Sequence, residues 1–321
     1  MIMKQLSIKL KRILKEGIRD LYYFGFTVML VNVCCIWSND STKSIVRRNK
    51  VLVQWLTRHF QELLRAYKEN VNPVTQNQFA EYPVWVFWWQ GREAMPEIIE
   101  LCYKSKLRAA GTHSVILLTK DNIREYVEFP EYVWQQFEAK KLRIQHLADM
   151  IRVQLIAKYG GIWLDASIYC IDNIPEEIYS ADVYSLKHEI DEQYVSLCRW
   201  TTFVIGGLKN NVLCSFLNEF FVEYCKTGKP FIDYYMFDCA IAVAYNNLPK
   251  VQDAIDKLQM SEKSCYWLDE HLSEYWKDTE RELKSQGIFQ KIAWQQYSNN
   301  SFGEDSLYTY LKQKEEEYAK S

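Results

Sequence analysis

The sequence predicts an α/β fold, and two observations support this prediction. The apolar run VWVFWW at residues 84–89 and the run at residues 114–119 have the composition of buried strands, and a helical pattern lies between them. Strand, helix and strand in this order form the crossover that joins parallel strands. The second observation is the strongest helical pattern of the chain, residues 144–161, which ends in two glycines and leads directly into another apolar run.

Residues 1–70 are expected to form a basic helical region. They contain 13 Lys and Arg residues against five Asp and Glu residues, a net charge of +8, whereas the whole chain carries −2. Leu10, Leu14 and Ile18 recur at helical spacing with lysines between them. An apolar run of 17 residues follows at residues 21–37, which is near the lower limit for a membrane span.

Positive charge on both sides of this apolar run argues against a single membrane span. We expect instead a basic amphipathic element on an anionic membrane surface, which would place the protein at the cytoplasmic face of the cell membrane as a peripheral protein. Two alternatives stay open: a helical hairpin packed on the rest of the protein, and a true span. The nine cysteines include no C-x-x-C pair and are expected to be reduced thiols, as in cytosolic proteins.

A polar segment with one proline, residues 71–80, is expected to be a linker, and residues 81–321 a single domain with a helical, charged C-terminal part. The chain contains no glycine-rich phosphate motif and no zinc-ligand spacing, and its overall charge does not indicate a nucleic acid partner. Further strands are expected at residues 182–186 and 200–207, and further helices at residues 211–225 and 234–245.

Charged side chains stand where this fold would present them to a ligand. Asp149 and Arg152 are three residues apart, so they share a face of their helix, and we expect that face to be polar. Asp165 interrupts the apolar run that follows the helix, at the expected end of a strand, and ligands bind at such strand ends in parallel sheets. A carboxylate there could hold a divalent cation on a diphosphate, or accept hydrogen bonds from sugar hydroxyl groups. The alternative for Asp149 and Arg152 is an ordinary exposed ion pair.

The segment LADMIRVQLIAKYGGIWLDAS, residues 147–167, resembles the block of DXD-type glycosyltransferases of the capsular polysaccharide synthesis family. That block has the pattern D-x-x-R, a helix, two glycines and D-x-[DTS]. The segments at residues 84–99 and 234–245 resemble two further parts of the family pattern. The resemblance implies a GT-A fold, which is a Rossmann-like mixed sheet flanked by helices, and a nucleotide-sugar donor.

The resemblance also implies roles for individual residues. Asp149 and Arg152 would contact the ribose and sugar of the donor, and Asp238 is a candidate for holding the acceptor or the transferring sugar. Mn²⁺ or Mg²⁺ would bind at Asp165 and Ser167, although the hydroxyl of Ser167 replaces the second acid of the motif and is the poorer ligand. The other positions of the expected donor site are Trp88, Trp89, Gly161 and Trp163.

Together these features predict a retaining glycosyltransferase. It would transfer a hexose, galactose or glucose, from a UDP-sugar to a lipid-linked saccharide of a bacterial capsule or cell-surface polymer. Two alternatives are kept: a transferase that uses another nucleotide sugar, such as a GDP- or dTDP-sugar, and a non-catalytic membrane-surface scaffold that has kept the fold. The presence of Asp149, Arg152 and Asp165 together favours the enzyme.

Overall fold

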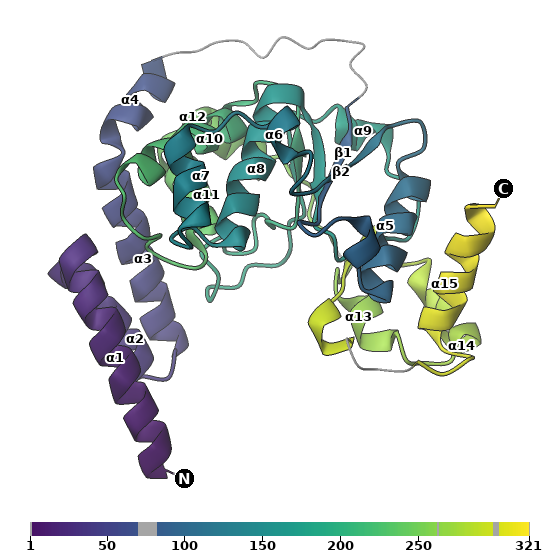
Figure 1. Cartoon of the computed structure of the whole chain (residues 1–321), viewed down its shortest axis with the longest axis horizontal. Helices are drawn as coiled ribbons and strands as arrows, with labels where there is room; N and C mark the ends of the chain where they lie inside the picture. The colour runs from purple at the N-terminus through teal and green to yellow at the C-terminus, as the bar shows by residue number, and fades with distance from the viewer. Residues whose placement is uncertain (1, 70–81, 262, 298–301, 321) are drawn as a thin grey trace.

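A five-stranded mixed sheet lies at the centre of the protein, between N-terminal helices on one side and C-terminal helices on the other (Figure 1). The computed structural model describes residues 2–69, 82–261, 263–297 and 302–320. The linker expected at residues 71–80 lies outside the described residues.

The strand order in the sheet is β2-β1-β3-β6-β5. β1 is parallel to both β2 and β3, and β6 is antiparallel to both β3 and β5. This confirms the expected mixed α/β sheet, whereas the narrower GT-A assignment stays a prediction. The bounds are β1 (Val84–Phe87), β2 (Val115–Leu118), β3 (Gly161–Leu164), β5 (Val183–Ser185) and β6 (Val204–Gly207).

Helices cover both faces of the sheet because side chains alternate between the faces along each strand. Trp85 and Trp163 point toward one apolar cluster, and Val84 and Ile162 point toward the other. On the first face pack α8 (Ile144–Tyr159), α10 (Val212–Lys226) and α11 (Met236–Asn247), and on the second α5 (Glu97–Ala109) and α9 (Glu176–Tyr179). The three helices predicted over residues 144–161, 211–225 and 234–245 are therefore confirmed, within two residues at each end.

Two glycines connect α8 to β3. Gly160 has a φ of +75° and Gly161 a φ of +97°, which is the left-handed region that favours glycine. A Cβ atom on Gly161 would lie 2.2 Å from the carbonyl oxygen of Pro83, and one on Gly160 would lie 2.6 Å from the ring of Tyr82. Both positions thus need glycine for the close packing of this turn against the segment that leads into β1.

The apolar run that Asp165 interrupts is divided between two sheets. β3 ends at Leu164, and β4 (Ile168–Cys170) pairs instead with β7 (Phe289–Lys291) in an antiparallel ribbon. Ile168 lies opposite Lys291 in this pairing, so the ribbon carries a residue from the far end of the sequence to the end of β3.

The C-terminal helices pack beside α5 (Figure 1). Arg108 of α5 forms an ion pair of 2.9 Å with the buried Glu315, whose carboxylate also accepts a hydrogen bond of 2.8 Å from the hydroxyl of Tyr169. The elements of this part are α13 (Trp267–His271), α14 (Trp276–Leu283), η2 (Trp294–Tyr297) and α15 (Leu307–Tyr318). The remaining short elements are η1 (Arg92–Ala94), α6 (Ile123–Tyr126), α7 (Glu131–Glu138) and α12 (Pro249–Asp256).

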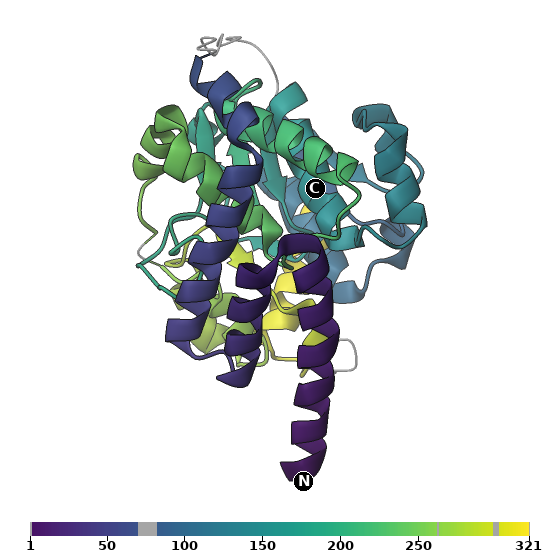
Figure 2. The same ribbon diagram turned by 90° about the vertical axis from the view of Figure 1, so that its left-hand side faces the viewer.

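Residues 2–69 form four helices: α1 (Ile2–Phe24), α2 (Phe26–Trp37), α3 (Thr42–His59) and α4 (Gln61–Glu69). Gly25, with a φ of +88°, divides the expected apolar run of residues 21–37, and α1 and α2 lie side by side as a hairpin (Figure 2). No helix among the described residues combines the length and the apolar character needed to cross a membrane. The packed hairpin, one of the alternatives kept above, is the arrangement that the structure shows.

This N-terminal region shares a core with the sheet. Leu52 and Leu56 of α3 are fully buried in the same apolar cluster as α8, α10 and α11. The ring of Phe60 lies 4.2 Å from the ring of Phe220 in α10. Removing residues 1–70 would therefore expose part of the core of the sheet domain.

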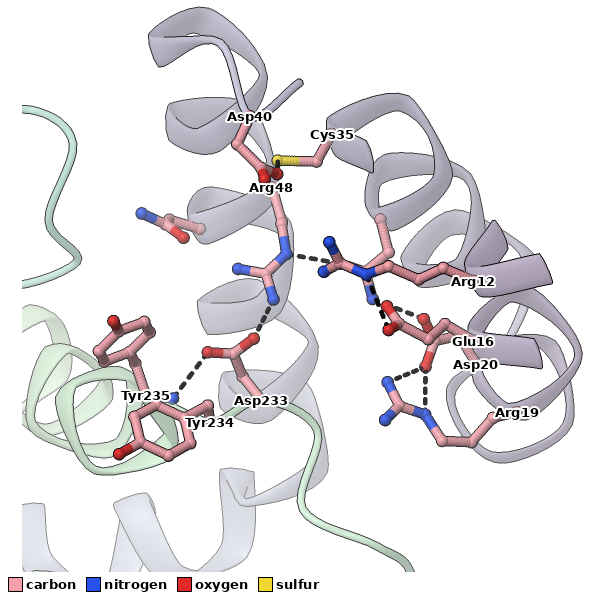
Figure 3. A network of polar contacts seen from close by, with 12 residues as sticks. Arg12, Glu16, Arg19, Asp20, Cys35, Asp40, Arg48, Asp233, Tyr234 and Tyr235 are labelled. Carbon is pink, nitrogen blue, oxygen red and sulfur yellow. Dashed lines mark hydrogen bonds and ion pairs between the residues drawn. The ribbon is translucent and has the colours of Figure 1, made fainter. Parts of the chain in front are cut away.

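A buried polar network also joins the hairpin to α11 (Figure 3). The fully buried Asp20 accepts a hydrogen bond of 2.7 Å from the side-chain amide of Asn32. The oxygen of that amide accepts a bond of 2.7 Å from Arg48, whose guanidinium group also pairs with Asp233 in the loop before α11. Asp233 in turn accepts a bond of 2.7 Å from the backbone N–H of Tyr235. The network thus connects α1, α2 and α3 to the start of α11.

Candidate functional site

The carboxyl ends of the parallel strands meet at one edge of the sheet. Trp88 follows β1 there, and Asp165 follows β3. Because β6 runs antiparallel to β3, the residues before β6 lie at the same edge, and the N–H of Asp165 donates to the carbonyl oxygen of Phe203 at 2.9 Å. This is the position at which α/β sheets bind ligands.

Both carboxylate oxygens of Asp165 have cationic partners. Oδ2 accepts a hydrogen bond of 2.8 Å from Nζ of Lys291, and Oδ1 lies 3.4 Å from Nη2 of Arg152. Oδ1 also accepts a hydrogen bond of 2.9 Å from the indole N–H of Trp163, two residues earlier. Burial raises the pKa of Asp165, but Lys291 and Arg152 outweigh it, so the pKa of this carboxyl is lowered overall.

Arg152 is buried, and the expectation that it lies on a polar helix face is wrong. α8 is sandwiched between the sheet and the helices α10 and α11, so both of its sides are covered. The guanidinium group lies 3.4 Å from Asp149, donates to the carbonyl oxygen of Thr202, and stacks 5.0 Å from the ring centre of Trp163. Its Nε atom is buried without a hydrogen-bond partner. Arg152 therefore holds two acids and the strand edge together.

Two further acids lie close to Arg152. Burial raises the pKa of Asp149 to about 7, against the opposing effect of Arg152. Asp238, in the first turn of α11, accepts a hydrogen bond of 3.0 Å from the indole N–H of Trp200, and burial raises its pKa to about 6. Buried carboxyl groups with raised pKa values beside a specific cation are typical of functional sites.

The structure thus brings together Asp149, Arg152 and Asp165, which we call the acid–arginine cluster, with Asp238 close by. Trp163 belongs to this cluster too, but its side chain is only 1% exposed. Its N–H binds Asp165 and its ring lies against Arg152, so it positions the cluster rather than reaching a ligand.

The other expected donor-site residues lie apart from the cluster. Gly161 begins β3, at the opposite end of the strand from Asp165, where it serves backbone packing. Trp88 and Trp89 are both half-buried and lie against different groups. The ring of Trp88 packs 5.4 Å from Trp294, and the ring of Trp89 packs 5.1 Å from Phe137 in α7. The expected place of Trp88 and Trp89 in the donor site stays a prediction.

The residues around Asp165 do not fit a divalent cation as they are arranged. Ser167 is buried in the turn after Asp165, and its hydroxyl is the weaker kind of ligand. Across the described ranges, no group of three or more His, Cys, Asp or Glu side chains is placed to hold a metal ion. Because Lys291 and Arg152 already neutralise Asp165, an added cation would compete with them.

Sequence reasoning missed two lysines. Lys291 ends the three-residue strand β7, and nothing in the local pattern connects it to Asp165, which is 126 residues earlier. Lys106 is completely buried under the turn after Asp165, where it donates hydrogen bonds to the carbonyl oxygens of Ala166 and Ile168. These bonds hold the turn in place, and nothing in the sequence around Lys106 indicates this role.

A cavity of about 1900 Å³ lies elsewhere, beside the edge strand β5. Its lining includes Tyr67, Tyr184 and Lys250, but none of the acid–arginine cluster. We place the functional site at the cluster, because that is where buried charges with shifted pKa values and the strand ends coincide.

The chain is similar to several known proteins. The family model for "Capsular polysaccharide synthesis protein" matches residues 34–311. The "O-glycosyltransferase braB" of the fungus Annulohypoxylon truncatum is 24% identical over 242 residues, which cover 68% of this chain. The chain spans about half, 53%, of the length of that relative. A solved structure, "PaToxG Glycosyltransferase", is 12% identical, with a TM-score of 0.38 over 83% of this chain and 97% of that chain.

Proposed function

The chain belongs to the capsular polysaccharide synthesis protein family, and we propose that it is a glycosyltransferase with its donor site at the acid–arginine cluster. The observation that carries this proposal is the convergence of Asp149, Arg152 and Asp165 at the carboxyl edge of β3. The name of the fungal relative, an O-glycosyltransferase, supports transfer to a hydroxyl group.

The chemistry of the cluster suits a nucleotide-sugar donor. Carboxyl groups such as those of Asp149 and Asp165 accept hydrogen bonds from ribose and sugar hydroxyl groups. Arg152 and Lys291 supply positive charge for the diphosphate, which must be stabilised as a leaving group. Asp238 lies in the first turn of α11, where it could hold a hydroxyl of the acceptor or of the transferring sugar.

In its full form the proposal is a retaining transferase that moves galactose or glucose from a UDP-sugar to a lipid-linked saccharide. The nucleotide, the hexose, the retention and the acceptor rest on the family pattern in the sequence. A Mn²⁺ or Mg²⁺ ion at Asp165 and Ser167 likewise stays a prediction. If the protein is an enzyme, the alternative to a UDP-sugar is a GDP- or dTDP-sugar donor. If it is not an enzyme, the alternative is a non-catalytic scaffold.

We also propose that the enzyme works at an anionic membrane surface, through α1. Leu10, Leu14, Ile18 and Leu21 recur at intervals of four, four and three residues, and each is at least 49% exposed. α1 also extends past the ends of α2 and α3 (Figure 2). A stripe of four exposed apolar side chains beside basic residues is typical of an interfacial helix. The basic residues of α1 whose side chains are described are Lys9, Lys11, Arg12, Lys15 and Arg19.

A thermal-shift panel tests the donor. Ligands that bind the folded state raise the melting temperature. A free ligand concentration of 100 times Kd adds about 2.7 kcal/mol to the free energy of unfolding. We expect UDP-galactose or UDP-glucose to raise it more than GDP-mannose or dTDP-glucose. We also expect slow hydrolysis of that donor without acceptor, and its loss in Asp165→Asn but not in Asp121→Asn, which changes an exposed loop acid. Binding without any hydrolysis or transfer would instead support the scaffold.

A further inference from the structure

We propose that the ammonium group of Lys291, together with the guanidinium group of Arg152, binds the diphosphate of the donor in place of a divalent cation. The chain would then bind its donor without a metal. This inference rests on the proposed function, because it assumes a donor that is a nucleoside diphosphate sugar. It departs from the expectation of Mn²⁺ or Mg²⁺ drawn from the sequence pattern.

The first argument is the position of Lys291. Its Nζ atom lies 2.8 Å from Oδ2 of Asp165, on the carboxylate that the sequence pattern assigns to the metal. The other oxygen of this carboxylate accepts a bond from Trp163 and faces Arg152. A divalent cation on either oxygen would sit beside an ammonium or a guanidinium group, and like charges at so short a separation repel strongly.

The second argument is the set of available ligands. A hard divalent cation needs several oxygen ligands, and carboxylates are the strongest of them in proteins. Where a second acid is expected, this chain has the buried Ser167. The nearby acids Asp149 and Asp238 are each engaged, with Arg152 and with the indole of Trp200. Among the described residues, no group of three or more His, Cys, Asp or Glu side chains is placed to hold a metal ion at Asp165.

The third argument is that Lys291 can still reach an anion. Its side chain is 24% exposed and that of Asp165 27% exposed, so the pair borders solvent. An ammonium group has three N–H donors, of which Asp165 uses one. A lysine held in this way can bind a phosphate as a point charge.

Lys106 adds to the positive charge behind the turn. It is fully buried, and it donates hydrogen bonds to the carbonyl oxygens of Cys102, Ala166 and Ile168 rather than to any carboxylate of the described residues. Basic side chains from three elements, α5, α8 and β7, therefore lie around Asp165 and the turn that follows it.

Titration calorimetry of the full chain with UDP and with GDP tests the proposal, once in excess EDTA and once with Mn²⁺. For the wild type we expect the same affinity in both buffers. Lys291→Gln should weaken binding roughly ten- to hundred-fold, and Lys291→Arg should restore most of it. Lys158→Gln is the matched control, because it removes a lysine that pairs with Glu128 on the outside of α8. This control should bind like the wild type.

The outcomes separate the two proposals. Nucleotide binding that requires Mn²⁺ and disappears in EDTA would overturn the role of Lys291 and leave the glycosyltransferase standing. Unchanged nucleotide affinity in a folded Lys291→Gln protein would likewise overturn the role of Lys291 without affecting the glycosyltransferase proposal. Failure of both nucleotides, and of the donor panel, to bind in either buffer would reject the nucleotide-sugar donor itself, and the role of Lys291 with it. Circular dichroism and melting temperature of each variant confirm that it is folded.

Discussion

Arg48 of α3 pairs with Asp233, the residue that holds the loop leading into α11 (Figure 3). The pair is mostly buried, with 21% of the Arg48 side chain and 8% of the Asp233 side chain exposed. The other carboxylate oxygen of Asp233 accepts the backbone N–H of Tyr235, three residues before Asp238. The N-terminal helices therefore help to position the start of α11, which carries Asp238.

Arg48→Gln should loosen this loop. The substitution leaves Asp233 without its charged partner, and we expect the free energy of unfolding to fall by roughly 2 kcal/mol. Hydrogen exchange of the Tyr235 amide should become faster, because its acceptor is no longer held. Arg47→Gln, at the exposed neighbouring position, is the control and should change neither quantity. Unchanged exchange in Arg48→Gln would show that the loop is held by other contacts.

The burial of Arg152 changes what is expected of Arg152→Ala. Removing a side chain from a polar helix face would cost little stability. Removing Arg152, however, leaves two partly buried acids without their shared cation. We expect a loss of stability of about 3–5 kcal/mol, together with loss of donor binding. Chemical denaturation measures the first effect. Lys158→Ala, in the last turn of the same helix, where the side chain is 34% exposed and pairs with the exposed Glu128, should change stability by less than about 0.5 kcal/mol.

Asp149 should make the stability of the protein depend on pH. Burial raises the pKa of Asp149 from 3.8 to about 7 in the folded state, so between these values the folded state binds more protons than the unfolded state. Its contribution is fully present below about pH 4 and is lost as the pH rises through about 7. We expect the free energy of unfolding of Asp149→Asn to fall less steeply between pH 5 and pH 8 than that of the wild type. The difference should be roughly 1.4 kcal/mol for each pH unit over which Asp149 is protonated only in the folded state.

Urea unfolding at a series of pH values measures this difference. The exposed-acid variant Asp121→Asn serves as the control and should follow the wild-type curve. If the curves of Asp149→Asn and the wild type are parallel, Asp149 is not a protonated acid near neutral pH. Asp238, whose pKa burial raises to about 6, contributes with the same sign and is present in all three proteins.

The apolar stripe of α1 can be tested without touching the core. Leu14 and Ile18 are 66% and 63% exposed, so the double change Leu14→Ser and Ile18→Ser should leave the melting temperature nearly unchanged. It should reduce co-sedimentation with anionic liposomes, since apolar burial and charge both contribute to interfacial binding. Ile190→Ser, which changes an equally exposed residue of the sheet domain, is the control. Equal sedimentation of all three proteins would reject α1 as the membrane contact.

Local patterns along the chain were sufficient for much of the fold. Alternation and apolar runs predicted β1, β2 and β3, and helical periodicity predicted α8, α10 and α11, because these signals depend on near neighbours. The glycines after α8 marked its end for the same reason. Asp165 could be recognised as a site residue, since an acid at the end of a buried strand is unusual in any context.

The long-range contacts were not accessible in this way. Lys291 meets Asp165 only because β4 leaves the main sheet and pairs with β7, a pairing that no local pattern encodes. The burial of Arg152 and Lys106 follows from which elements cover α8 and α5, although the sequence pattern placed Arg152 on a polar helix face. The hairpin of α1 and α2 packs on the body because Phe24 and Val28 lie in the same apolar cluster as the buried leucines of α3. Side-chain periodicity determines which face of an element is apolar, but the charges that neutralise a buried carboxylate depend on partners that only folding brings together.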